Sequence, residues 1–345
     1  MAEEATTGGG HQMAMVFDLN KCIGCQTCAV ACKELWTRDG GADYQWWCSV
    51  NTQPGHGTPK DWEQMGGGYR GGIPVRGIAP SREDFGGGWD FNYEEVFYGG
   101  KNEQVPLRVL GEQPTWGPNW DEDQGGGDYP NSYFYYLPRL CNHCTHPACL
   151  EACPRAAMFK RSEDGIVLRE ESRCRGYRFC AEACPYQKIY FNYERKIGQH
   201  CIMCYPRLEQ GVAPGCARQC PGRLVFVGYL DDPEGPIHKL VHEWGVALPL
   251  HPEYGTMPNI YYVPPLAPAP LNEDLSVDES RSRIPDDYLE RQFGPRVHQA
   301  LATLKAEMAK KRNGEGSELM DMLIVYKWQD LFPTLARDPV EIKWE

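Results

Sequence analysis

The spacing of the cysteines constrains this chain more than any other feature of its sequence. Of its sixteen cysteines, four lie between residues 22 and 32, eleven lie between residues 141 and 220, and only Cys48 lies outside these blocks. A chain of 345 residues is far longer than the small secreted domains that disulfides stabilise. Residues 1–20 include Glu3 and Glu4 and no apolar segment of the kind found in secretory signals. Metal ligation is therefore the expected use of these thiols.

The cysteines form four consecutive motifs. The first has the spacing C-x2-C-x2-C-x3-C, by which bacterial ferredoxins bind iron–sulfur clusters, with the fourth thiolate directed to a second cluster. The second and fourth motifs lengthen the loop in the middle, and proline follows the last cysteine of the second, third and fourth motifs. The cysteines are Cys22, Cys25, Cys28 and Cys32 in the first motif, Cys141, Cys144, Cys149 and Cys153 in the second, and Cys201, Cys204, Cys216 and Cys220 in the fourth.

The third motif lacks one thiol. It contains Cys174, Cys180 and Cys184, and Tyr177 stands where the second cysteine would be. Because a cubane corner without its thiolate readily loses its iron, this motif predicts a [3Fe–4S] cluster among [4Fe–4S] clusters. The motifs use fifteen of the sixteen cysteines, for three [4Fe–4S] clusters and one [3Fe–4S] cluster, which leaves Cys48 as a buried or interface thiol.

Zinc, disulfides and histidine ligation explain these motifs less well. Structural zinc sites take ligands in pairs, rather than three thiols at x2 spacing followed by x3-Cys-Pro. A disulfide framework would require these closely spaced cysteines to form one set of pairs out of many possible sets. His143 and His146 lie inside the second motif, where the cysteines already suffice as ligands. We therefore expect these histidines to donate hydrogen bonds around the cluster or to affect its potential.

The composition narrows the possible partners and activities. The 35 basic and 47 acidic residues give a net charge of −12, which disfavours a nucleic-acid partner. No apolar run approaches the length needed to cross a bilayer, so we expect no direct membrane span. The glycine runs lack the Lys-Ser/Thr of a phosphate-binding loop. The sequence shows no pattern of a catalytic nucleophile or of paired carboxylates, so we expect no catalytic site in this chain.

The remainder of the sequence predicts few regular elements. Residues 33–140 combine three Gly-Gly-Gly runs with seven of the ten tryptophans, and we interpret them as an ordered, loop-rich insertion that lies against another protein. Further along, the sequence predicts a strand over 223–229, a short helix over 235–245 and an extended Pro-rich arm that crosses a surface over 249–270. It also predicts a helical region over 285–312, interrupted near Gly294-Pro295, and a helix over 318–328.

The motifs resemble those of one family. The stretches KCIGCQTC, LCNHCTHPACLEACP, CRGYRFCAEACPYQKIYFN and CIMCYPRLEQGVAPGC, in this order, are similar to those of the beta (electron-transfer) subunits of molybdopterin enzymes of the dimethyl sulfoxide reductase family. The branch that the chain resembles includes nitrate, selenate, chlorate and perchlorate reductases, dimethyl sulfide dehydrogenase and ethylbenzene dehydrogenase. The resemblance covers nearly the whole chain and does not specify a substrate.

The resemblance implies that ligands cross between motifs. The first and fourth motifs would bind two [4Fe–4S] clusters, one through Cys22, Cys25, Cys28 and Cys220 and the other through Cys32, Cys201, Cys204 and Cys216. The second and third motifs would bind a third [4Fe–4S] cluster through Cys141, Cys144, Cys149 and Cys184, and the [3Fe–4S] cluster through Cys153, Cys174 and Cys180.

The implied fold is α+β, with two bacterial-ferredoxin-like modules built from cluster-binding repeats of the ββ-αβ type. Residues 1–32 with 190–230 would form the first module and residues 141–189 the second. Residues 33–140 would lie at a subunit interface, and residues 231–345 would form a Pro-rich arm and C-terminal helices.

The implied function is electron transfer without a catalytic site in this chain. The clusters would relay electrons between a molybdopterin catalytic alpha subunit and a haem b gamma subunit of an anaerobic hydrocarbon or sulfide dehydrogenase or oxyanion reductase. A free-standing polyferredoxin is the alternative, although such a carrier does not need the insertion or the arm. The shorter relatives imply a periplasmic location, reached by export together with the catalytic subunit, and the cytoplasm is the alternative.

Overall fold

A computed structural model describes residues 11–42, 45–55, 69–70, 73–74, 125–192 and 194–341. Their core is a four-stranded sheet with the strand order β10-β1-β12-β11. Strand β1 (Met13–Asp18) lies antiparallel to β10 (Val225–Tyr229) and parallel to β12 (Ile260–Val263), and the short β11 (Leu248–Pro249) pairs with β12. Every residue of β1 and β12 is buried, as expected of strands covered on both faces. The N-terminal strand is thus enclosed by segments from much later in the chain.

The Pro-rich segment 249–270 lies deeper than the sequence suggested. The expected arm across a surface is wrong for its middle part, which forms the buried strand β12 and pairs with β1 from Met15↔Ile260 to Asp18↔Val263. Prolines flank this strand but do not occur within Ile260–Val263, so its backbone amides remain available for pairing.

Antiparallel pairs of short strands complete the β structure. Strand β2 (Ser49–Gln53) pairs with β5 (Tyr135–Arg139). The other pairs are β3 (Tyr69–Arg70) with β4 (Ile73–Pro74), β6 (Met158–Lys160) with β7 (Val167–Arg169), and β8 (Ile189–Asn192) with β9 (Ile197–His200). Most of the insertion expected over residues 33–140 lies outside the described residues.

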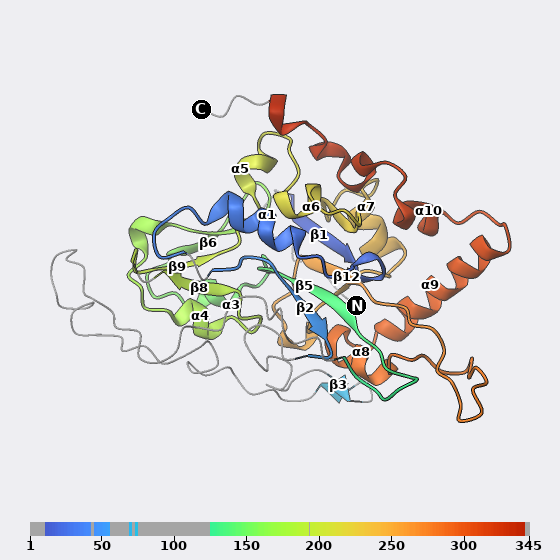
Figure 1. The fold of residues 1–345 in the computed structure, drawn as a ribbon. Coiled ribbons are helices and arrows are strands. Elements are labelled where there is room, and N and C mark those ends of the chain that lie inside the picture. Colours follow the sequence, from blue (N-terminus) through green and yellow to red (C-terminus); the bar gives the residue numbers. More distant parts are fainter. Residues whose placement is uncertain are drawn as a thin grey trace.

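Short helices accompany the cysteine motifs. They are α1 (Thr27–Trp36), α3 (Ala148–Glu151), α4 (Phe179–Ala183), α5 (Tyr205–Leu208) and α6 (Gly215–Arg218). Helix α1 packs against α6, and α3 packs against α4 (Figure 1). The first motif is therefore next to the fourth, and the second is next to the third. The 3-10 turns η1 (Leu19–Lys21) and η4 (Glu171–Arg173) precede the first and third motifs.

The C-terminal part is mainly helical, and most of its elements were predicted. Strand β10 confirms the strand expected over 223–229, and α7 (Pro236–His238) with the π-helical η5 (Lys239–Glu243) confirms the helix over 235–245. Helices α8 (Asp286–Phe293) and α9 (Val297–Arg312) confirm the interrupted helical region, with the break at Gly294, whose φ is 76°. This part of the chain also contains the 3-10 turns η6 (Pro252–Tyr254), η8 (Pro333–Leu335) and η9 (Pro339–Glu341).

The last predicted helix is shorter than expected. Ser317 caps α10 (Glu318–Ile324) by accepting a hydrogen bond from the amide of Met320. The helix ends before residue 328 because Val325 adopts the left-handed conformation, with φ 53°, and the 3-10 turn η7 (Trp328–Leu331) follows.

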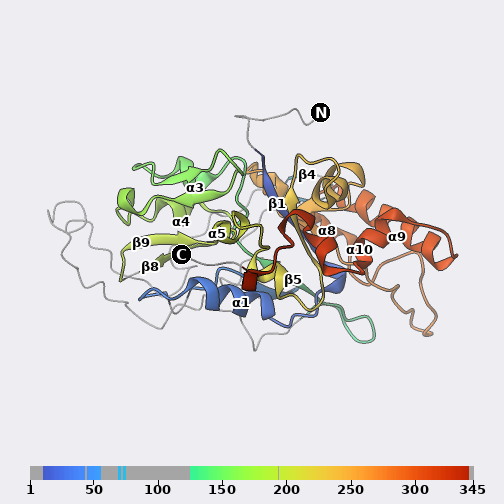
Figure 2. The same ribbon diagram turned by 90° about the horizontal axis from the view of Figure 1, so that it is seen from above.

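The arrangement places the helical C-terminal part away from the cysteine-rich hairpins. Helices α8, α9 and α10 lie at one end of the molecule, and α3, α4, β8 and β9 lie at the other, with β1 between them (Figures 1 and 2). In the described part of the chain, no helix combines the length and apolar character that a membrane crossing needs. The expected mixture of α and β structure is confirmed, whereas the division into two ferredoxin-like modules stays a prediction.

Candidate metal centres

Four thiols from the first and fourth motifs surround one cavity. The first thiol group consists of Cys22, Cys25, Cys28 and Cys220, which line a cavity of about 360 Å³, its opening to solvent included. The pKa of the Cys22 thiol is raised to about 12, chiefly by burial and also by the thiolates of Cys28 and Cys220. Cys25 is exposed, so this group reaches the molecular surface.

A second set of thiols from the same two motifs lies fully inside the protein. The second thiol group consists of Cys32, Cys201, Cys204 and Cys216, all buried. Burial raises the pKa of the Cys32 thiol well above its usual range, and the thiolates of the other three members raise it further. The thiol of Cys32 on α1 therefore faces thiols supplied by the fourth motif.

Thiols from the second and third motifs surround another cavity. The third thiol group consists of Cys141, Cys144, Cys149 and Cys184, which line a cavity of about 380 Å³, its opening to solvent included. Burial and then the thiolate of Cys184 raise the pKa of Cys144 to about 12. His143 and His200 belong to the wall of the same cavity.

The fourth thiol group has three members, Cys153, Cys174 and Cys180. The pKa of Cys180 is raised to about 12 by burial and then by the thiolates of Cys174 and Cys153. A Cβ atom at Gly198 would lie 3.3 Å from the Sγ of Cys180. The glycine at this position therefore leaves space for the thiol.

The loop that contains Tyr177 repeats the backbone of the loop that contains Cys25. Each loop follows a 3-10 turn, has a left-handed glycine just before the residue compared (Gly24, φ 66°; Gly176, φ 71°), and has a left-handed residue just after it. That following residue, Gln26 or Arg178, is the N-cap of α1 or α4. Tyr177 thus occupies the position of the second thiol in a loop of the same local conformation.

The four thiol groups follow one another as a row. The thiolates of each group raise thiol pKa values in the next group, in addition to the larger effect of burial. The pairs that interact across group boundaries include Cys28 with Cys216, Cys141 with Cys201, and Cys149 with Cys180. The order along the row is therefore first, second, third and fourth.

The donor set fits clusters with several iron atoms. Among the residues that the structure describes, no three or more His, Cys, Asp or Glu side chains are arranged to hold a single metal ion. The thiols of the first and third groups surround a shared space, as ligands at the corners of an iron–sulfur cluster do.

Several N–H groups in the described part of the chain donate hydrogen bonds to cysteine sulfurs. The indole Nε1 of Trp36 lies 3.1 Å from the Sγ of Cys204. The amide of Met203 lies 3.3 Å from the Sγ of Cys201, and the amide of Ala157 lies 3.3 Å from the Sγ of Cys153. Such donors stabilise thiolates and set cluster potentials. Sequence reasoning missed Trp36, because its partner lies in a distant segment.

Two buried basic side chains lie near the second and third thiol groups, and sequence reasoning missed both. Arg139 is 2% exposed and donates to the carbonyl oxygen of Tyr186, and Lys188 is 1% exposed and donates to the hydroxyl of Ser49 at 2.7 Å. Burial and then the charge of Arg139 lower the pKa of Lys188 well below its usual range, whereas the thiolates of Cys48, Cys184 and Cys201 raise it. Anionic centres on either side favour the charged form of this lysine.

The remaining residues singled out in the sequence occupy distinct environments. Cys48 is buried, and its Sγ lies 3.9 Å from that of Cys28. His146 is exposed, whereas His143 is fully buried and its Nδ1 accepts a hydrogen bond from the amide of Val167 at 3.2 Å. Burial and then the charge of Arg169 lower the pKa of His200 to about 4.

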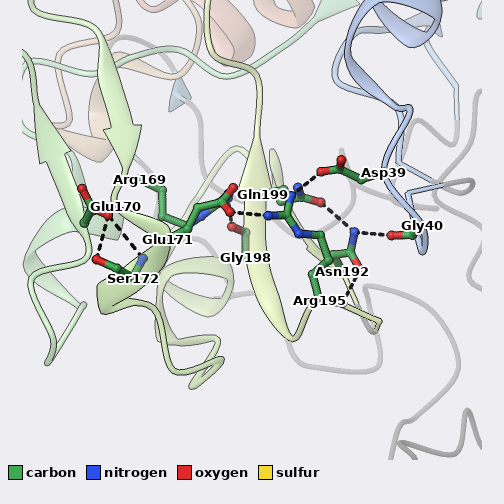
Figure 3. Close-up of polar contacts among 10 residues, drawn as sticks. All are labelled: Asp39, Gly40, Arg169, Glu170, Glu171, Ser172, Asn192, Arg195, Gly198 and Gln199. Carbon is green, nitrogen blue, oxygen red and sulfur yellow. Dashed lines mark hydrogen bonds and ion pairs between the residues drawn. The ribbon is translucent and has the colours of Figure 1, made fainter. Parts of the chain in front are cut away.

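An ion-pair network connects the segment after α1 with the segment before the third motif. Arg195 in the turn between β8 and β9 pairs with both Asp39 and Glu171 (Figure 3). Arg169 also pairs with Glu171, at 2.6 Å, and Asn192 donates to the carbonyl oxygen of Gly40 at 2.9 Å. The network joins segments that follow the first motif and flank the third.

Comparison with known proteins agrees with this donor set. Residues 132–230 match a family model described as a 4Fe-4S dicluster domain. The selenate reductase subunit beta of Thauera selenatis is 55% identical over 326 residues, which covers 93% of this chain and 98% of the relative. The respiratory nitrate reductase subunit beta of Haloferax mediterranei is 57% identical over 326 residues, with coverage of 92% and 91%. The dimethylsulfide dehydrogenase subunit beta of Rhodovulum sulfidophilum is 53% identical over 324 residues, with coverage of 93% and 98%.

These relatives match nearly from end to end, and each is named as a beta subunit. The chain belongs to the iron–sulfur beta subunits of the oxidoreductases of the dimethyl sulfoxide reductase family.

Proposed function

We propose that this chain carries three [4Fe–4S] clusters and one [3Fe–4S] cluster and passes single electrons between a molybdopterin catalytic alpha subunit and a haem b gamma subunit. The first three thiol groups would each hold a [4Fe–4S] cluster, and the fourth would hold the [3Fe–4S] cluster. The observation that carries the proposal is that thiols from motifs far apart in the sequence gather in four groups, two of which line cavities. The packing of α1 against α6 and of α3 against α4 brings these motifs together. Bound clusters supply reversible one-electron chemistry.

The residues of this chain hold and insulate the row. Buried thiols would bind the clusters, N–H donors such as Trp36 would stabilise the bound thiolates, and apolar residues would exclude water. The aromatic side chain of Tyr177 supplies no thiolate, so the fourth group would keep three irons. Within the described residues, the chemistry requires no nucleophile or general base, and the chain transfers electrons without a reaction site of its own.

The two ends of the row are suited to contact with other subunits. Ile23, between two thiols of the first group, is 67% exposed, and Phe179, beside a thiol of the fourth group, is 42% exposed. Exposed apolar side chains at both ends favour partner contacts. The relatives are named as beta subunits, which supports an alpha partner. We assign the alpha subunit to the end with the first group and the gamma subunit to the end with the fourth.

Purification of the native complex tests the proposal. We expect a molybdenum-containing large subunit to co-purify, and electron paramagnetic resonance of the oxidised complex to show a three-iron signal that a Cys180→Ala variant loses. A matched Cys48→Ala variant should retain it. A wild-type complex without this signal would contradict the cluster assignment, and recovery of the chain alone as a brown soluble protein would favour a free-standing polyferredoxin.

Substrate and location are separate parts of the proposal. The relatives are named for selenate, nitrate, chlorate and dimethylsulfide, so we propose an oxyanion reductase or a hydrocarbon or sulfide dehydrogenase. Following the family resemblance, we place the complex in the periplasm after export with its catalytic subunit. Fractionation of native cells tests the location, and recovery of the chain only in the spheroplast lysate would place it in the cytoplasm.

A further inference from the structure

Two buried imidazoles belong to the wall of the cavity that the third thiol group surrounds. The ring centroids of His143 and His200 are 6.0 Å apart, and the ring planes meet at 62°. Both side chains are withdrawn from solvent, with 0% exposure for His143 and 5% for His200. A buried imidazole N–H needs an acceptor, because leaving it without one is costly.

The hydrogen-bond partners decide where each ring carries a proton. The amide of Val167 donates to Nδ1 of His143, so this nitrogen has a lone pair and the ring proton is on Nε2. In His200, Nδ1 lies 2.7 Å from the carbonyl oxygen of Cys201, which can only accept, so Nδ1 carries a proton and donates it there. The N–H of His200 at Nδ1 is thus already used by the backbone.

The N–H of His143 has no such partner. Its Nε2 is buried and lacks a hydrogen-bond partner among the described residues. This nitrogen lies on the other side of the ring from the Val167 amide, in a residue that lines the cavity together with four thiols. An acceptor inside the cavity would satisfy it, and sulfur atoms are the acceptors that an iron–sulfur cluster offers.

We propose that Nε2–H of His143 donates a hydrogen bond to a sulfur atom of the [4Fe–4S] cluster held by the third thiol group, and thereby raises its reduction potential. This inference rests on the proposed function. The reduced cluster carries one more negative charge than the oxidised cluster, so a donor stabilises the reduced form more strongly. The cluster gains one electron from one neighbouring cluster and loses one to the other, while the proton stays on His143.

The structure distinguishes His143 from the second histidine of the same motif. His146 is exposed, and its side chain does not line the cavity. The two histidines therefore provide a matched pair of positions, three residues apart in the same loop, with one N–H expected to contact the cluster and one not.

The test measures the potential of each cluster in the intact complex. Redox titration followed by electron paramagnetic resonance would compare His143→Phe, which removes the N–H, with His143→Gln, which keeps an amide donor, and with His146→Gln. We expect His143→Phe to lower the equilibrium constant for reduction of one four-iron cluster about tenfold, which lowers its potential by about 59 mV for one electron. His143→Gln should recover much of this shift, and His146→Gln should cause none.

The outcomes separate this inference from the proposed function. A wild-type complex without four-iron signals would overturn the cluster assignment itself. Complete cluster signals with unchanged potentials in His143→Phe would overturn only the role of His143. If that variant fails to assemble, electron–nuclear double resonance of the wild-type complex with ¹⁵N-histidine decides. A weakly coupled imidazole nitrogen at one reduced four-iron cluster, lost in His143→Gln, supports the proposal, and no such coupling overturns it.

Discussion

The indole of Trp36 at the end of α1 donates its N–H to the thiol of Cys204, at 3.1 Å, across 168 positions of sequence. We predict that Trp36→Phe lowers the potential of the cluster held by the second thiol group, because the thiolate loses a donor. The phenyl ring keeps most of the packing, so the loss in stability should be about 1 kcal/mol. Redox titration of the complex checks this result, and a shift confined to another cluster would contradict the assignment.

Cys48 should be dispensable for iron binding. It is buried next to Cys28, but its side chain does not line the cavity of the first thiol group. We predict that Cys48→Ala leaves the iron and sulfide content unchanged at a cost of about 1 kcal/mol in stability. Cys28→Ala is the matched comparison and should lose the first cluster. Equal losses of iron in the two variants would show that Cys48 is a ligand.

Tyr177→Cys should convert the three-iron site into a four-iron site. The loops around Cys25 and Tyr177 share the same sequence of left-handed positions, so a thiol at residue 177 has the backbone setting of a second ligand. We expect the oxidised complex to lose its three-iron resonance and gain a four-iron signal on reduction. Tyr177→Phe controls for loss of the phenol and should retain the three-iron resonance. Persistence of that resonance in Tyr177→Cys would mean that the added thiol does not reach the missing corner.

Removing the buried charge of Lys188 should affect two clusters at once. Its ammonium group interacts with Cys201 of the second thiol group and Cys184 of the third. Bound anionic clusters on both sides would keep Lys188 charged, and a positive charge stabilises the reduced clusters. We therefore predict that Lys188→Met lowers both potentials, by on the order of 50 mV each. Lys310→Met on the surface of α9 is the control and should shift neither. A change in only one potential would indicate that the lysine serves a single cluster.

The network around Arg195 should contribute little to stability. The side chains of Arg195, Asp39 and Glu171 are 38%, 51% and 45% exposed, and water screens such pairs. We expect Arg195→Gln to lower the melting temperature by no more than about 3 °C at low salt and by less in 1 M salt. Arg281→Gln, which breaks the exposed pair with Asp278, is the matched control. A large decrease that does not depend on salt would show that Arg195 has a structural role beyond these pairs.

The sequence predicted local features better than contacts between distant segments. The strand ending at Tyr229 and the break at Gly294 follow from short-range patterns of apolar residues, glycine and proline. The central position of β12 could not be predicted, because a four-residue strand between prolines gives little signal and depends on β1 for pairing.

The same limit applies to the candidate site. Motif spacing identified the thiols but could not determine which motifs lie together, since that depends on α1 packing against α6 and α3 against α4. The family resemblance supplied that pairing as an implication. Lys188 was missed because a lysine in an ordinary apolar strand region has no distinctive pattern until its burial is known.

The position of β1 has a consequence for biosynthesis. A ribosome delivers this strand long before β10 and β12, which are its neighbours in the sheet. Cys22 likewise reaches its cavity only when Cys220 has been made. The first thiol group is therefore complete only after residue 220 has been made, and until β10 and β12 emerge the apolar strand β1 lacks its partners in this sheet.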